Sequence, residues 1–373
     1  MRRVLPRLLA TLAALALLAL LAATWHYSDL ILGPDEPPVR RGQAILAHDD
    51  STITLATGTK ALRPGRWAIE WVDGFGEIGP VIRKEPGRVV RPFRLVGGSA
   101  PDSVARLGGF ARDADPQSWL GMPFEAVEYP SSHGPVPAWL VPGTDSTWAV
   151  LVHGRAATRA EVLRMLPVYH ALGLPCLVIC YRNDRCGPRV LEGHYQMGLT
   201  EWHDVEDAVR FALDHGARRV VPVGCSMGGS AVSEFLRHSA LVSHVPAAVL
   251  DAPALDWNAM FEVGARKRHV PAWLTELGKW LATARTGIRF GELVQASHAT
   301  EFRTPILLLH GERDDTAPVE VSRRFAATRP DLVTFVPFPE AGHVEAVNYE
   351  EARYRRVVSE WLYAHGVGRP PGD

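Results

Sequence analysis

One short segment constrains the fold of this chain more than any other: a Gly-x-Ser-x-Gly turn at residues 224–228, followed by a further glycine. The turn comes directly after the apolar, β-branched run 219–223 and directly before a helical pattern at 230–238. Glycines at 224 and 228 have no Cβ, so a strand and a helix can approach closely around Ser226. The pattern predicts a strand–turn–helix unit in which a strained Ser226 presents its hydroxyl group at the start of the helix.

Apolar segments alternate with amphipathic segments over about the last two thirds of the chain. We expect strands near residues 124–129, 135–141, 148–152, 175–181, 219–223, 247–251, 305–309 and 332–337. Helical patterns separate them, near residues 159–172, 201–215, 230–238, 319–328 and 350–364. Nearly continuous apolar strands that alternate with helices indicate a parallel sheet covered on both faces, and the leading hairpin makes it mixed. The prediction is an α/β fold with a mostly parallel eight-stranded sheet.

Residues 252–303 interrupt this alternation between two of the expected strands. The segment contains large apolar residues at partly helical spacing, including Trp257, Trp273 and Trp280. Such an insertion often covers a site as a cap. The alternative is that these side chains only bury the faces of their own helices.

The N-terminus carries a signal for location. Arg2, Arg3 and Arg7 precede an uncharged stretch at residues 8–25, which as a helix would be about 27 Å long, close to the thickness of a bilayer core. The basic flank predicts that residues 1–30 hold a membrane helix with the rest of the chain outside the cytoplasm. We favour a retained single-pass anchor, because the apolar stretch is long for a signal peptide and no clean Ala-x-Ala site ends it. A cleaved signal peptide and a secreted protein are the alternative.

After a proline-containing linker at residues 31–38, residues 36–118 are expected to form a small β-rich module, because short strand-like runs alternate there with Gly and Pro. One segment, 74–79, formally matches the dinucleotide-binding pattern Gly-x-Gly-x-x-Gly. Pro80 and a strand-like run follow it where that motif needs a helix, so we interpret it as a cluster of β-turns.

Charge and cysteine content exclude several classes of function. The net charge is −1 with acidic and basic residues interspersed, so no nucleic-acid partner is expected. The four cysteines show no zinc-binding spacing, and Cys176 and Cys180 would lie about 13 Å apart on one strand, too far for a disulfide. We interpret the cysteines as small buried thiols that do not indicate the redox compartment. No metal or other cofactor is expected.

Ser226 needs a base before its hydroxyl group can act as a nucleophile. Of the fifteen histidines, His343 follows the last expected strand on a glycine-containing loop, at the same edge of the sheet as Ser226. A carboxylate must then orient the imidazole. Asp314, just after the strand at 305–309, is our choice, with Asp315 and Asp251 as alternatives. The expected catalytic residues are therefore Ser226, Asp314 and His343.

An oxyanion formed at such a serine needs backbone N–H donors. One expected donor is Met227, directly after the nucleophile. The other is Arg155, in the loop His153-Gly154-Arg155 that follows the strand at 148–152. His153 is expected to be a structural turn residue.

These motifs resemble those of the α/β-hydrolase superfamily, from about residue 119 to residue 366. His153-Gly154, the Gly-x-Ser-x-Gly turn around Ser226, and the loops that carry Asp314 and His343 occur in that superfamily's order. The chain also looks like uncharacterised membrane-anchored bacterial hydrolases and, more loosely, the prolyl-oligopeptidase-like branch. The segments Tyr181-Arg-Asn-Asp184 and Thr200-Glu-Trp-His-Asp204 carry this resemblance. The loop reads His-Gly-Arg-Ala where many lipases have His-Gly-Gly-Gly, which puts a preference for bulky acyl groups or tertiary alcohols in doubt.

The resemblance implies a serine hydrolase that works through an acyl-enzyme intermediate, and it leaves the substrate open. We expect carboxylic esters as substrates, with short peptides as an alternative. A binding protein without activity on the same fold is a further alternative, although such proteins usually lose one of the three catalytic residues.

Overall fold

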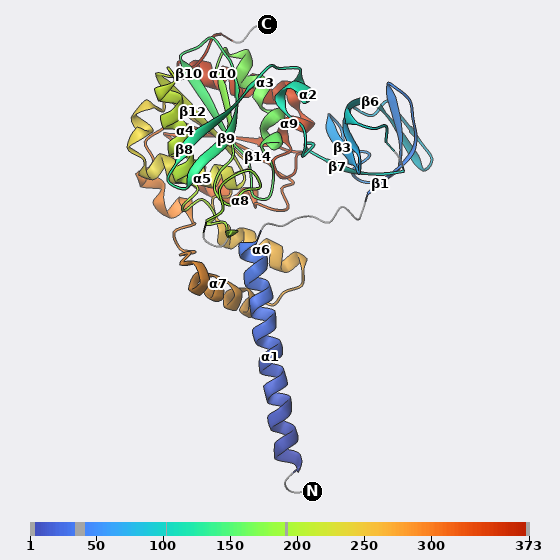
Figure 1. Cartoon of the computed structure of the whole chain (residues 1–373), viewed down its shortest axis with the longest axis vertical. Coiled ribbons are helices and arrows are strands. Elements are labelled where there is room, and N and C mark those ends of the chain that lie inside the picture. Colours follow the sequence, from blue (N-terminus) through green and yellow to red (C-terminus); the bar gives the residue numbers. More distant parts are fainter. Residues whose placement is uncertain (1–3, 34–41, 102, 191–192, 371–373) are drawn as a thin grey trace.

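The computed structural model describes residues 4–33, 42–101, 103–190 and 193–370. Arg2, Arg3, most of the expected linker and the expected start of the β-rich module at residue 36 lie outside the described residues. Figure 1 shows three parts: a long N-terminal helix α1 (Val4–Leu32), a small β module, and a large α/β domain. The end of α1 lies against the α/β domain, and the rest of the helix projects away from it.

The sheet of the large domain has eight strands in the order β15-β14-β13-β12-β10-β11-β9-β8. They are β8 (Glu125–Ser131), β9 (Gly134–Val141), β10 (Thr147–Val152), β11 (Cys176–Ile179), β12 (Arg219–Cys225), β13 (Ala248–Asp251), β14 (Ile306–Gly311) and β15 (Val333–Phe338). The hairpin β8–β9 and the β9–β11 pair are antiparallel, and the remaining pairs are parallel. The predicted mixed, mostly parallel sheet is confirmed.

Helices cover both faces of this sheet (Figure 1). They include α4 (Trp202–Asp214), α5 (Met227–His238), α8 (Val319–Thr328), α9 (Ala346–Tyr349) and α10 (Glu351–Ala364). The single helix expected at 159–172 is instead a 3-10 helix, Arg159–Arg164, followed by the short α3 (Leu166–Ala171). Pro167 explains the break, since it has no N–H for a continuous helix and is tolerated at the start of a new one.

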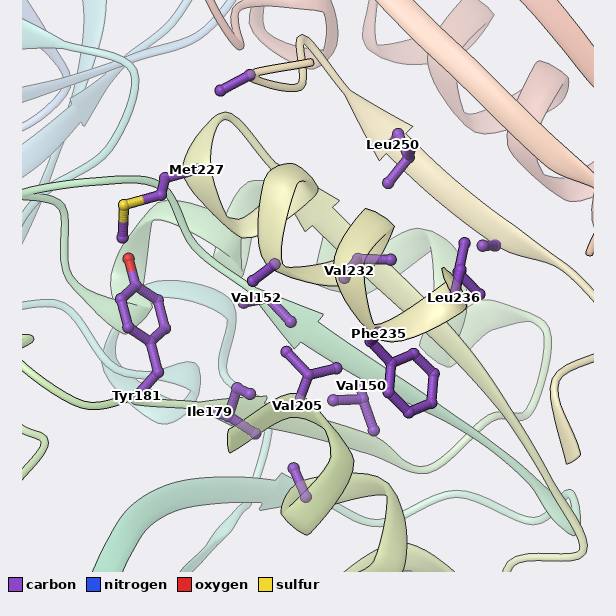
Figure 2. Packing of buried hydrophobic residues seen from close by; sticks show 14 of the residues in the cluster. Val150, Val152, Ile179, Tyr181, Val205, Met227, Val232, Phe235, Leu236 and Leu250 are labelled. Carbon is purple, nitrogen blue, oxygen red and sulfur yellow. The ribbon is translucent and has the colours of Figure 1, made fainter. Parts of the chain in front are cut away.

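Strand β10 shows how the core forms on both faces of the sheet. Val150 and Val152 belong to one cluster of buried side chains, and Ala149 and Leu151 belong to the other. Because side chains alternate along a strand, an all-apolar strand supplies both clusters. Figure 2 shows the first cluster, in which Val232 and Phe235 of α5 lie over the sheet. This packing fixes the helix that begins directly after Ser226.

The β module has one antiparallel sheet of seven strands. They are β1 (Gln43–His48), β2 (Thr52–Ala56), β3 (Trp67–Trp71), β4 (Gly74–Ile78), β5 (Arg83–Glu85), β6 (Arg88–Gly98) and β7 (Val104–Gly108), and the helix α2 (Pro116–Leu120) follows. An additional β2–β6 pairing closes the sheet into a barrel-like form.

The interpretation of residues 74–79 as β-turns was wrong, since they form strand β4 and its end. A Cβ on Gly76 would lie 2.5 Å from the Arg94 carbonyl oxygen. The glycine at this position therefore permits a close approach of neighbouring strands, which is another common use of glycine in a sheet.

The module packs against the loop and helix that follow His343. Arg63 forms an ion pair with Glu345 at 2.6 Å, and the Asn348 side-chain amide donates to the Arg66 carbonyl oxygen at 2.9 Å. Trp67 meets Tyr349 edge to face, with ring centroids 5.2 Å apart. The module thus supports the segment that holds His343 in position.

The insertion between β13 and β14 contains α6 (Trp257–Lys267), α7 (Ala272–Thr286) and the 3-10 helix Gln295–Glu301. Trp257 is buried and donates from its indole nitrogen to the Ser230 hydroxyl at 3.1 Å. Trp273 and Trp280 on α7 are exposed. Helix α7 packs against α1, where Arg285 pairs with Asp29 at 2.6 Å. The insertion thus joins the end of α1 to the large domain.

The cysteine interpretation needs correction. Cys180 and Cys186 form a disulfide, with their Cα atoms 5.9 Å apart, whereas Cys176 and Cys225 are buried free thiols. Spacing along a strand excluded only the pair Cys176 and Cys180. The loop after β11 reverses direction and brings Cys186 back to Cys180, which spacing along a strand cannot reveal.

Candidate active site

Ser226 lies at the turn between β12 and α5, with φ 50° and ψ −119°. The neighbouring glycines leave no room for a side chain. A Cβ on Gly228 would lie 2.3 Å from the Val152 carbonyl oxygen, and one on Gly224 would lie 2.5 Å from the Gly228 carbonyl oxygen. This packing holds Ser226 in a conformation that non-glycine residues rarely adopt.

The structure brings Ser226, His343 and Asp314 together at the carboxyl ends of β12, β15 and β14. Nε2 of His343 lies 2.9 Å from Oγ of Ser226, and Nδ1 of His343 lies 2.7 Å from Oδ2 of Asp314. With Nδ1 protonated and donating to the carboxylate, Nε2 is left to accept the serine proton. An imidazole in this arrangement can take a proton from an alcohol and return it later.

Asp314 is almost fully buried and its oxygens are fully used. Oδ1 accepts the backbone N–H groups of Thr316 and Ala317, both at 2.8 Å, and His310 Nε2 lies 3.1 Å from Oδ2. Burial acts to raise the pKa of Asp314, but the charge of His343 and hydrogen bonds from His310 and His343 outweigh it and hold the pKa well below its usual range. The carboxylate is therefore ionised at neutral pH.

The pKa of His343 is shifted in the opposite direction. Burial acts to lower this pKa, but the negative charge of Asp314 and the hydrogen bond to it raise it above the ordinary histidine value. A base with a raised pKa accepts a proton more readily than an unperturbed imidazole.

The two other carboxylates considered for this position lie elsewhere. Asp315 is exposed and pairs with Lys267 at 2.9 Å. Asp251 is fully buried at the end of β13, and burial raises its pKa to about 6. The hydrogen bond from Nδ1 of His343 goes to Asp314, so the geometry favours Asp314.

The loop after β10 passes directly beside the serine. A Cβ on Gly154 would lie 3.0 Å from Cβ of Ser226, so a larger residue there would press on the serine. Arg155 follows, and its guanidinium group donates to the carbonyl oxygens of Leu30 and Gly33 at the end of α1. Met227 is the first residue of α5. The two residues predicted as oxyanion donors thus flank Ser226 from two different elements.

Three residues that hold this loop were not identified from the sequence. The Gly154 N–H donates to Oε2 of buried Glu161 at 2.7 Å, and the Tyr181 hydroxyl donates to the Gly154 carbonyl oxygen at 2.9 Å. Asp184, inside the disulfide-closed loop, accepts from Nε2 of His153 at 2.8 Å. Tyr181 and Asp184 belong to the segment Tyr181-Arg-Asn-Asp184 that carries the resemblance to the prolyl-oligopeptidase-like branch, but the sequence does not reveal their contacts with this loop, which only the fold brings about.

His153 itself is fully buried, and its other ring nitrogen lies 2.8 Å from the Gly154 carbonyl oxygen. Burial acts to lower the pKa of His153, but the charge of Asp184 and the hydrogen bonds raise it. These contacts describe an anchor for the loop.

Among the described residues, one group has the spacing to ligate a metal ion: Cys180, Asp184 and Cys186. The two cysteines are bonded to each other, so neither offers the thiolate that a metal would require. This group therefore does not fit a metal site in its oxidised form.

Two segments of the chain match known families. Residues 191–365 match the prolyl oligopeptidase family, and residues 44–108 match a domain of unknown function (DUF8805). No curated protein matches the chain.

Solved structures give the same result for the fold. The Pyrococcus furiosus esterase Pf2001 is 19% identical, with a TM-score of 0.55 over 68% of this chain and 96% of the esterase. Thermogutta terrifontis esterase 2, solved after phosphonylation by sarin, is 18% identical, with a TM-score of 0.51 over 68% of this chain and 98% of the esterase. The chain has the α/β-hydrolase fold. Within it, residues 191–365 are similar to the prolyl oligopeptidase family.

Proposed function

We propose that this protein is a serine hydrolase that cleaves carboxylic esters by transferring the acyl group to Ser226. The observation that carries the proposal is the hydrogen-bonded series from Ser226 through His343 to Asp314, at 2.9 and 2.7 Å. The esterases named above share the fold, which adds support for an ester substrate.

In the proposed mechanism, Oγ of Ser226 attacks the ester carbonyl carbon while Nε2 of His343 takes its proton. The carbonyl oxygen becomes an oxyanion, which the N–H groups of Met227 and Arg155 stabilise. His343 then gives the proton to the leaving alcohol, and an acyl-enzyme remains. Water repeats the sequence with His343 again as base, and the acid is released.

We also propose that α1 is a retained membrane anchor with the hydrolase domain outside the cytoplasm. Residues 9–32 of α1 are long and apolar enough to cross a membrane, with a mean hydropathy of 1.9. The buried contacts of Ser28, Ile31 and Leu32 support retention, because cleavage would remove a packed surface. The Cys180–Cys186 disulfide supports an oxidising compartment.

A peptidase is the second candidate, because residues 191–365 match the prolyl oligopeptidase family. The same series of side chains serves amide hydrolysis, which differs in needing a protonated amine as leaving group.

Steady-state turnover of a panel of p-nitrophenyl esters and aminoacyl p-nitroanilides by the full chain in detergent would separate the two candidates. The proposal predicts turnover of the esters. Turnover of the anilides alone would refute the ester assignment, and inertness of folded protein toward both would refute a hydrolase function.

The raised pKa of His343 predicts the pH dependence. His343 must be neutral to accept the serine proton, so kcat/KM for p-nitrophenyl acetate should be constant at alkaline pH and fall as pH decreases through the pKa of His343. The midpoint should lie above the value of about 6.5 for an unperturbed histidine. A profile of kcat/KM between about pH 5 and 9, corrected for spontaneous hydrolysis, checks this. A midpoint below the unperturbed value would mean that Asp314 does not act on His343 as proposed.

Glu161 is a positioning residue for the loop after β10, which carries the proposed oxyanion donor Arg155. Replacing Glu161 with alanine leaves the Gly154 N–H without its acceptor, so the loop should shift and kcat should fall by about 100-fold with little change in KM. Glu161→Gln keeps an acceptor oxygen for the Gly154 N–H, so this variant should retain most of the wild-type kcat. If both variants lose kcat equally, or if only KM changes, the positioning role is wrong.

A further inference from the structure

A cavity of about 350 Å³ lies between the end of α1 and the insertion that follows β13. Its walls are mostly apolar and include Leu30 and Ile31 of α1, together with Met260, Phe261 and Gly264 of α6. This volume is within the range of sites that bind small molecules. A helix that could cross a membrane thus forms one wall of a cavity in the hydrolase domain.

Two further residues of the cavity wall connect it to the proposed catalytic residues. The backbone N–H of Thr316 donates to Oδ1 of Asp314 at 2.8 Å. Arg155 directly follows Gly154, which packs against Ser226. The guanidinium group of Arg155 donates to the Leu30 carbonyl oxygen at 3.2 Å. Thr316 of the cavity wall thus contacts Asp314, Arg155 of the wall adjoins the loop beside Ser226, and α1 forms another part of the wall.

The exposed apolar surface indicates where a bilayer would end. Six leucines of α1 are more than half exposed, and Trp25 is 54% exposed. The six are Leu9, Leu12, Leu15, Leu17, Leu18 and Leu21. Beyond Trp25 the helix packs against α7, where Trp273 and Trp280 lie two helical turns apart and are 57% and 67% exposed. Exposed tryptophans at the end of an apolar helix are typical of the membrane interface. Figure 1 shows α6 and α7 beside this end of α1.

We propose that the cavity binds the acyl chain of an ester that resides in the membrane, with the ester carbonyl held at Ser226. This inference rests on the proposed esterase function. Oγ of Ser226 bonds to the carbonyl carbon, and the bond to the leaving alcohol breaks as that alcohol takes the serine proton through His343. The acyl chain stays in the cavity until water releases it as a fatty acid. An acyl chain fits because the walls are mostly apolar, and the membrane is its source because α1 forms one of those walls.

Filling the cavity tests the inference. In the full chain reconstituted in phosphatidylcholine vesicles, kcat/KM is measured for p-nitrophenyl dodecanoate and for p-nitrophenyl acetate. Gly264→Phe places a ring in the cavity from α6, at a helical glycine whose added Cβ would meet only the end of the Arg268 side chain at 3.5 Å. Leu30→Trp fills it from α1. Gly291→Phe, at an exposed glycine whose added Cβ would have nothing within 4 Å, is the matched control.

The dodecanoate-to-acetate ratio of kcat/KM should fall about tenfold or more in Gly264→Phe and in Leu30→Trp, and it should stay at the wild-type value in Gly291→Phe. If Gly264→Phe does not fold, Leu30→Trp decides alone. An unchanged ratio in a folded cavity variant, with acetate still hydrolysed, would overturn this inference and leave the esterase function standing. If the wild-type protein hydrolysed neither the dodecanoate nor the acetate, the esterase function itself would be overturned.

Discussion

Replacing Ser226 with alanine should lower kcat for ester hydrolysis by about 10⁴- to 10⁶-fold without unfolding the protein. The variant removes the only atom that forms the acyl bond in the proposed mechanism. It changes little else, because Ser226 Oγ contacts His343 and the strained turn is fixed by the glycines around it. Steady-state kinetics with p-nitrophenyl acetate measures the loss, and circular dichroism with thermal unfolding confirms that the fold is retained.

Ser233→Ala is the matched control for this experiment. Ser233 is a buried serine in α5, the helix that follows Ser226. Its hydroxyl donates to the Gly229 carbonyl oxygen at 2.7 Å, one turn earlier in that helix. Its kcat should stay within about threefold of wild type, since a hydroxyl group that bonds only within its own helix has no part in the reaction. Equal losses in the two variants would mean that the effect comes from helix stability and that Ser226 is not the nucleophile.

Asp314→Asn should lower kcat by about 10⁴-fold with little change in KM. The asparagine oxygen can still accept the N–H groups of Thr316 and Ala317, which turns its NH₂ group toward His343. Nδ1 of His343 must then accept a hydrogen bond, so its proton moves to Nε2 and the ring can no longer take the proton of Ser226. Kinetics of the purified variant across pH measures this loss.

Asp315→Asn tests whether the assignment of the carboxylate is specific. Asp315 is adjacent in the sequence, but it is exposed and pairs with Lys267 at the surface. We expect kcat within about threefold of wild type, because exposed ion pairs contribute little. If the Asp315 variant is the one that loses activity, the choice of Asp314 is wrong and the loop has a different arrangement in solution.

The α/β sheet could be predicted from the sequence because its strands are nearly continuous apolar runs. All eight expected strands are present, since a strand buried on both faces leaves a clear local pattern. In the β module the prediction was poorer. Strand β4 contains two glycines, and strand β7 is a short segment with Arg106 at its centre and a glycine at its end, so neither shows the periodic pattern that identifies a strand.

In the candidate site, too, some residues could be predicted from the sequence and others could not. Ser226, Asp314 and His343 each follow a recognisable strand, so the sheet topology predicts that they converge. Glu161 and Asp184 act through contacts that exist only after folding. Glu161 looks like an ordinary acidic residue in the sequence, and the motif that contains Asp184 does not reveal its contact with His153. The contact between α1 and α7 was missed for a related reason. Hydropathy identifies a membrane helix but says nothing about what its end packs against.

A reaction with a fluorophosphonate probe, followed by intact-mass measurement and peptide mapping, tests the central claim most directly. Such probes phosphonylate a serine only when a neighbouring base activates it and donors stabilise the charged intermediate. We expect one adduct per chain, located on Ser226, and no adduct on Ser226→Ala. Folded wild-type protein that stays unlabelled, or a Ser226→Ala variant labelled to the same extent, would contradict the account.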